Sequence, residues 1–244
     1  MSTKGSSKSM SFWLQLFSLT TLGLIPLIVF RTIINPSSLA THPQLVGSIF
    51  IVICLLGAIV GVRPSSFSWS YYETGKTAID DSQEHETLNQ KPAHQGHHHS
   101  CDQFSDHVLK IRNNVFCAGC TGLTTGAVIS IYGGISYFFL GISLVNEFLV
   151  FWIGFAGVFV GIVQHHLYRA LSVRSGFIRY ILNVVFVLGA FFLLVGANQI
   201  VGNIAVDFYV LCVILLWIFN RIMMSSTEHE RVCMQCDIES CKHI

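Results

Sequence analysis

The run FIRYILNVVFVLGAFFLLVGA, residues Phe177–Ala197, decides the fold class of this chain. Its one charged residue, Arg179, lies near its start. A helix that crosses the hydrocarbon core of a bilayer needs about 20 predominantly apolar residues. The run therefore predicts a transmembrane helix.

Five more runs of similar character lie on either side of it. Of all 244 residues, 52% are hydrophobic and 11% are charged, whereas a soluble domain carries about 25% charged residues. Lipid must therefore be the solvent for much of the chain, and we predict an all-α, polytopic membrane helix bundle of six transmembrane helices. Their predicted bounds are Phe12–Ile33, Leu45–Val62, Gly119–Ser143, Phe148–Leu167, Phe177–Ala197 and Ile204–Ile222.

The placement of basic residues predicts the orientation. Of the 14 Lys and Arg residues, only Arg31 falls on the side opposite to all the others. Cytoplasmic loops carry the excess of Lys and Arg, so we expect a multi-pass protein of the cell membrane with both termini in the cytoplasm. The net charge of +1 argues against a nucleic-acid partner. The bilayer is the expected partner, and other subunits of a membrane complex are candidates.

The predicted organisation has five parts. They are an N-terminal hairpin of two helices at 1–62, a flexible cytoplasmic loop at 63–96, a Cys/His metal-type module at 97–120, a four-helix bundle at 119–224, and a cytoplasmic Cys/His tail at 225–244.

Cysteine and histidine gather directly before the third span. Cys101, His107, Cys117 and Cys120 offer three thiols and one imidazole, a ligand set that zinc accepts in a closed tetrahedral shell. His99 is a fifth candidate. The N-terminus of a helix also favours thiolate, which a metal ligand and a redox-active cysteine both require. The pattern therefore favours metal binding, with a redox thiol pair or thiols without a role as the alternatives.

This segment resembles a family of uncharacterised prokaryotic small membrane proteins. The resemblance lies within residues 99–126 and includes the run from Val115 to Gly126, VFCAGCTGLTTG. The family motif begins with Cys-His and continues to Cys-Ala-Arg-Cys-Thr-Gly at the entry to a helix. Here Gly119 takes the place of the Arg, and Cys101 is not followed by His. The resemblance implies a prokaryotic membrane protein with a metal-binding knuckle, and it assigns no activity.

A second cluster lies in the tail, where Cys233, Cys236, Cys241 and His243 offer four ligands in a short segment. Each cluster could hold its own ion, which is our preferred interpretation, or the two Cys-x2-Cys turns could share one. Zinc is the expected ion, while iron or an iron–sulfur cluster is an alternative. His165 and His166, near the end of the fourth span, are weaker candidate ligands on the same face.

Small residues in two spans predict close helix packing. Gly122, Gly126, Ser130 and Gly134 recur every four residues in the third span, as do Gly157 and Gly161 in the fourth. Such ridges let helix backbones approach closely in lipid, so we expect these two spans to pack together as a hairpin.

The sequence shows no His-Glu-x-x-His, Gly-x-Ser-x-Gly or Walker motif, and we name no catalytic residue. We predict an integral membrane protein whose cytoplasmic zinc sites serve a structural or interaction role. The sequence favours a protein without enzymatic activity over an enzyme. The alternatives are a membrane thiol/quinone oxidoreductase and a metal transporter or sensor. The absence of charge near the centre of any span weighs against transport.

Overall fold

The computed structural model describes residues 3–34, 42–62, 94–95, 108–111, 114–143, 146–171 and 175–233. These ranges hold six helices and three short strands, so the predicted helical class is confirmed. The helices are α1 Thr3–Ile34, α2 Pro43–Val62, α3 Ala118–Phe138, α4 Glu147–Leu171, α5 Gly176–Val201 and α6 Ile204–Cys233. The strands are β1 His94–Gln95, β2 Val108–Ile111 and β3 Asn114–Cys117.

Within the described ranges, five helices are long and apolar enough to cross a membrane. These are α1, α2, α4, α5 and α6. Helix α3 has 21 residues, which is sufficient length, but ten of them are Gly, Thr or Ser, and this lowers its hydropathy. The chain is therefore a multi-pass helical membrane protein, and the sixth crossing rests on α3 alone.

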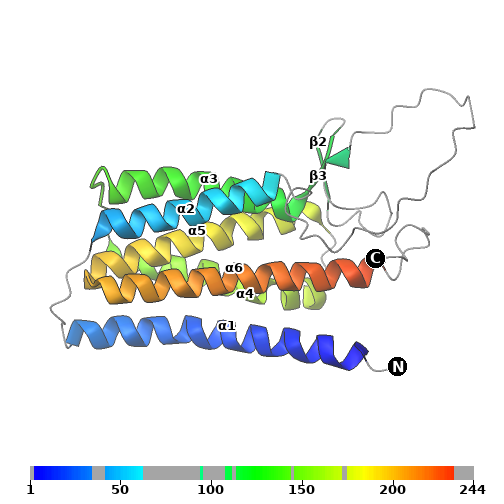
Figure 1. Ribbon diagram of the computed structural model, residues 1–244, viewed down its shortest axis with the longest axis horizontal. Coiled ribbons are helices and arrows are strands. Elements are labelled where there is room, and N and C mark those ends of the chain that lie inside the picture. Colours follow the sequence, from blue (N-terminus) through cyan, green and yellow to red (C-terminus); the bar gives the residue numbers. More distant parts are fainter. Residues whose placement is uncertain are drawn as a thin grey trace, which may run out of the picture.

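The helices lie side by side, and the strands sit at one end of the bundle (Figure 1). The same end holds the start of α1, the end of α2, the starts of α3 and α5, and the end of α6. We call it the sheet end. The α5–α6 connection lies at the opposite end, where Gly202 adopts a left-handed conformation with a φ of 58° that favours glycine.

Helix α5 is the centre of the bundle. Of the residues in its apolar segment, 56% are buried inside the structure, compared with 22–33% in the other four candidate spans. It packs against α3, α4 and α6, while α2 packs on α3 and α1 packs on α6. Its sequence is apolar on every side, which suits a helix surrounded by other helices. Leu193, Leu194 and Val195 are fully buried in succession.

The predicted hairpin between the third and fourth spans is wrong. Gly122 lies against Tyr180, and Gly126 against Val184 and Val187, all on α5. The ridge of α4 contacts α5 as well, where a Cβ at Gly157 would be 3.0 Å from the Gly189 Cα. Both ridges therefore permit close approach as expected, but α5 lies between them and is their shared partner.

Helix α1 is attached to α6 by buried polar groups. The Trp217 indole N–H donates to the Ser18 carbonyl and to the Thr21 hydroxyl, each at 3.3 Å. The Asn220 amide donates to the Ser18 hydroxyl at 2.8 Å. Hydrogen bonds of this kind join helices in lipid, where an apolar contact gains little over contact with the acyl chains.

A small sheet, which we did not predict, connects to α3. Strand β2 is antiparallel to β3 and β1 is parallel to β3. Strands of two and four residues are too short for a period of two to be visible in the sequence. Strand β3 continues directly into α3, with Cys117 as the N-cap residue in an extended conformation.

Two predicted boundaries also differ. Helix α6 continues past Ile222 to Cys233, so the predicted tail at 225–244 begins inside a helix. Helix α1 begins at Thr3, well before Phe12. A helix pairs its own backbone groups in water as well as in lipid, so hydropathy marks the apolar part of a helix and not its full length.

Candidate functional site

Two of the predicted metal ligands have side chains that the structure describes, Cys117 and Cys120. Cys233 is the last residue of α6, and His165 and His166 lie in α4. Six predicted ligands lie outside the described residues: His99, Cys101, His107, Cys236, Cys241 and His243. In the described part of the chain, no three His, Cys, Asp or Glu side chains come close enough together to hold a metal ion.

The two described thiols meet at the β3–α3 junction. Cys117 is 9% exposed and ends β3, and Cys120 is half-buried in the first turn of α3. Their side chains form a hydrogen bond with each other. Two thiolates so close repel each other, so this pair needs a bound cation to be fully ionised. Two neighbouring thiols are what a Cys-x2-Cys turn contributes to a tetrahedral metal shell.

The sheet brings one further segment to this turn. Val108, the first residue of β2, pairs with Cys117. The Val108 carbonyl also packs against Gly176 at the start of α5, where an added Cβ would collide with it. The residue that directly precedes Val108 in the sequence is the predicted ligand His107. Strand β2 is thus held both to β3, which ends in Cys117, and to the start of α5.

One residue that we did not predict, Asn183, lies beside the Cys-x2-Cys turn, and a second, Arg221, bonds to it. Asn183 of α5 is buried, with 4% exposure, and its Cβ would be 2.8 Å from a Cβ placed at Gly122. The amide of Asn183 donates to the Arg179 carbonyl at 2.7 Å and accepts from the Arg221 guanidinium. In the sequence, Arg221 served only as evidence of orientation, although an ionisable residue inside an apolar helix is itself a signal of function.

Arg221 joins three helices at the sheet end. From α6 it donates to the Gly161 carbonyl of α4 at 2.8 Å and to the Asn183 carbonyl oxygen of α5. Its guanidinium carbon lies 5.3 Å from the centre of the Phe186 ring. A planar fork of this kind suits Arg and cannot be reproduced by Lys.

A second polar cluster lies at the opposite end of the bundle. The Tyr137 hydroxyl donates to the Asn198 carbonyl oxygen, and the Asn198 amide donates to the Asp207 carboxylate, each at 2.8 Å. Asp207 is 0% exposed. The structure shows that it belongs to a hydrogen-bonded group that joins α3, α5 and α6.

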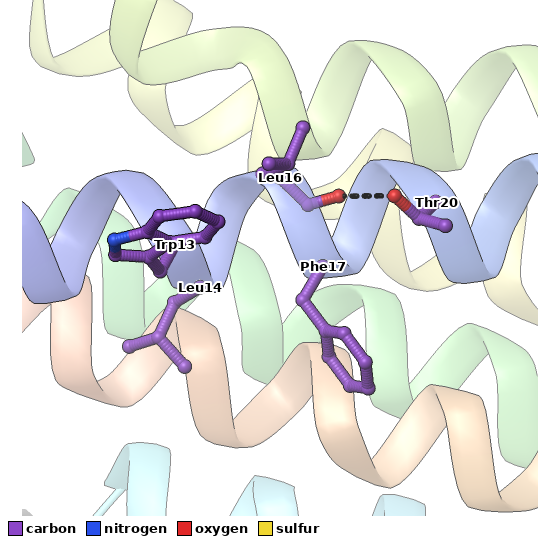
Figure 2. Close-up of a pocket in the computed structure, with 5 residues that line it drawn as sticks. All are labelled: Trp13, Leu14, Leu16, Phe17 and Thr20. Atoms are coloured by element: carbon purple, nitrogen blue, oxygen red, sulfur yellow. Dashed lines mark hydrogen bonds between the residues drawn. The ribbon is translucent and has the colours of Figure 1, made fainter.

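One hollow in the surface lies on α1 (Figure 2). Its lining comes from α1 alone: Trp13, Leu14, Leu16, Phe17 and Thr20. The Thr20 hydroxyl donates to the Leu16 carbonyl at 2.8 Å. Because Trp13 and Phe17 are more than half exposed, this apolar face is suited to contact with lipid acyl chains.

Comparisons with protein-family models, curated proteins and solved structures gave no match. The resemblance of residues 99–126 to the small membrane proteins named above stays a prediction. The thiol pair and the two polar clusters are the features from which a function can be argued.

Proposed function

We propose that this chain is a six-span protein of the cell membrane, with both termini in the cytoplasm, that holds structural zinc at the sheet end. The observation that carries the proposal is the Cys117–Cys120 pair, hydrogen-bonded at the β3–α3 junction with β2 alongside. Cys101 and His107 are the proposed remaining ligands, and His99 is a candidate for the same shell. Mixed Cys and His ligands favour zinc, with iron as the alternative.

We propose that the tail cluster holds a second ion. Helix α6 ends at Cys233, at the same end of the bundle as Cys117 (Figure 1). Cys236, Cys241 and His243 follow in the sequence. This placement is compatible both with two local sites and with one shell shared by the two Cys-x2-Cys turns. His165 and His166 of α4 are the weaker candidates.

The proposed role of the zinc is to fix the cytoplasmic segments against the bundle, so that the protein can serve as an interaction subunit of a membrane complex. A short segment of sheet and tail has little apolar core, and a structural metal supplies folding free energy directly. The predicted resemblance to small membrane proteins with a metal-binding knuckle is compatible with this role.

Elemental analysis of the full chain, purified in detergent, tests the zinc proposal. We expect one or two zinc ions per chain, and we expect Cys117→Ser and Cys120→Ser to lose one of them. Cys212→Ser is the matched control, because Cys212 is an exposed thiol in the first half of α6. Equal zinc content in Cys117→Ser and Cys212→Ser would contradict the proposal.

A thiol oxidoreductase is the second candidate, favoured by the same hydrogen-bonded thiol pair at a helix N-terminus. Its signature would be a protein without metal in which Cys117 and Cys120 form a disulfide reversibly. Mass spectrometry after titration with a thiol redox buffer separates the two candidates, since bound zinc protects both thiols from alkylation.

The sixth span and the orientation need their own test. Helix α3 lies between α2 and α5 in the bundle, as expected for a crossing helix. Ser143, beyond its far end, and Ser225 of α6 are both exposed. With a membrane-impermeant maleimide on intact cells, we expect Ser143→Cys to be labelled, and Ser225→Cys only after permeabilisation. His42→Cys, at the exposed residue directly before α2, completes the test, because α2 and α3 are the only described helices between it and Ser143. Labelling of one of these two positions but not the other in intact cells would contradict a crossing by α3.

A further inference from the structure

We infer that Asp207 binds and releases a proton inside the hydrogen-bonded cluster that it forms with Asn198 and Tyr137. The proton comes from the surrounding water, and the cluster loses its negative charge when the proton binds. The inference is independent of the proposed zinc site, because the cluster lies at the α5–α6 connection and the sheet lies at the opposite end of the bundle (Figure 1).

A carboxyl group is removed from water at this position. Asp207 is 0% exposed and lies within the apolar part of α6, Ile204–Ser225. Glu147, the other acidic residue at this end whose side chain the structure describes, is exposed. A buried ionisable side chain is costly to keep inside a membrane span, and such residues mark proton and ion sites. Asp207 is therefore the acidic group at this end for which a function must be sought.

The cluster lies where its three helices end. Tyr137 is the last residue but one of α3, Asn198 lies in the last turn of α5, and Asp207 lies in the first turn of α6. Tyr137 is half-buried, whereas the other two side chains are buried. Helix ends open more readily than helix centres. Local opening at this end therefore gives protons access to Asp207.

The hydrogen bonds run towards the carboxylate. The Tyr137 hydroxyl donates to the Asn198 carbonyl oxygen, and the Asn198 amide donates to Asp207 Oδ2, each at 2.8 Å. This direction suits an ionised carboxylate, which can only accept hydrogen bonds. The first turn of α6 also favours a negative charge. The structure thus shows the arrangement expected when the proton is absent.

The same three side chains can also hold the protonated carboxyl. A carboxamide has an acceptor on one arm and donors on the other, and the two arms are nearly equal in size. When the Asn198 amide turns over, its oxygen accepts from the protonated Asp207 and its nitrogen donates to the Tyr137 hydroxyl oxygen. The bound proton stays on Asp207, and Tyr137 keeps its own. Both protonation states therefore keep two hydrogen bonds within the cluster, and the three helices stay joined in both.

Other titratable groups lie near this end of α6. Among the described helices that pack against α6, α5 and α2 bring no acidic or basic side chain to this end, and α1 brings Arg31, which is exposed. His42, directly before α2, is exposed, and Tyr209 of α6 is half-buried. Arg31, His42 and the tyrosines carry no carboxyl group, so the infrared absorption of a protonated carboxyl separates Asp207 from all of them.

Infrared difference spectra of the full chain, reconstituted in lipid and titrated with acid, test the inference. We expect a protonated-carboxyl C=O band that grows as the pH falls and is missing in Asp207→Asn. Glu147→Gln is the matched control, since it removes an exposed carboxyl at the same end and should leave this band unchanged. If Asp207→Asn does not fold, ¹³C-aspartate labelling assigns the band, which should shift on labelling in the wild type and not in Asp207→Glu.

The role of Asn198 has its own readout. Asn198→Leu should move the band to higher frequency, because the protonated carboxyl loses its acceptor, whereas a role in packing alone would leave the frequency unchanged. An unchanged frequency in this variant would overturn the inference. So would an Asp207 band that is absent at every pH, or present at full strength at every pH, of the folded wild type. Zinc content does not enter this readout, so failure of the inference and failure of the proposed function are separate results.

Discussion

Replacing Gly189 by Ala should drive α4 and α5 apart and destabilise the bundle. A Cβ at this position would lie 2.7 Å from the Val158 nitrogen, 2.8 Å from the Gly157 carbonyl carbon and 3.0 Å from the Gly157 Cα. All three atoms belong to the backbone of α4, so no side-chain rotation can relieve the collision. Ordinary contact between such atoms begins near 3.5 Å.

The expected magnitude follows from this geometry. To restore ordinary contact, the two helix axes must separate by roughly 0.7 Å at this point. The separation would also loosen neighbouring contacts, such as that of Gly196 with the Phe151 backbone. Overpacking of this size costs about 1–3 kcal/mol. Gly57→Ala is the matched control, because a Cβ there meets nothing within 4 Å, and the higher helix propensity of Ala should leave it neutral or up to about 1 kcal/mol more stable.

Reversible unfolding in mixed detergent micelles, followed by circular dichroism, gives both free energies. The reasoning requires Gly189→Ala to be less stable than Gly57→Ala by at least about 1 kcal/mol. Equal stability of the two variants would refute close backbone packing of α4 on α5. A loss in Gly57→Ala as large as that in Gly189→Ala would show that glycine flexibility matters, and not contact.

Three further outcomes are expected, with stability taken from the same unfolding measurement and zinc content from elemental analysis. Asn198→Leu leaves the Asp207 carboxyl without its amide donor and should cost about 1–3 kcal/mol. Trp217→Phe keeps an aromatic ring but loses the hydrogen bonds to α1, so it should cost about 0.5–1.5 kcal/mol. Gly122→Ala, whose Cβ would lie 2.5 Å from the Tyr180 carbonyl oxygen, should reduce both stability and zinc content, while Gly119→Ala, with no contact under 3.9 Å, should change neither.

The helices could be predicted from the sequence because hydropathy acts within each segment. Two predicted boundaries coincide with the structure. The predicted last span starts at Ile204, where α6 begins, and the predicted second span ends at Val62, where α2 ends. Each boundary lies where apolar and polar residues meet in the sequence, because apolar residues lie in the hydrocarbon core and polar residues lie outside it. Such signals need no knowledge of the partner helices.

The partners of the helices could not be predicted, because a glycine ridge encodes close approach and not the identity of what approaches. The ridge through Gly126 fits any helix with a complementary surface, and α5 supplies one with Val184 and Val187. The neighbour of the Cys-x2-Cys turn was missed for the same reason. Asn183 is distant in the sequence from Gly122, and only the packing of α3 on α5 brings the two residues together.

Each of the two polar clusters at the ends of α5 depends on its own asparagine of that helix, Asn183 at the sheet end and Asn198 at the other. This explains how a largely apolar bundle can specify one arrangement. Asn183 and Asn198 lie about 22 Å apart along the helix, given a rise of 1.5 Å per residue. Each amide bonds to α6, through Arg221 at the sheet end and through Asp207 at the other. Sliding α5 by one residue would leave both pairs unsatisfied in a medium without water. Contacts at glycine provide the attraction between the helices, but many sliding positions would offer similar contacts. The two amides therefore fix the position of α5 along α6, and that position in turn sets the surface on which the Cys-x2-Cys turn rests.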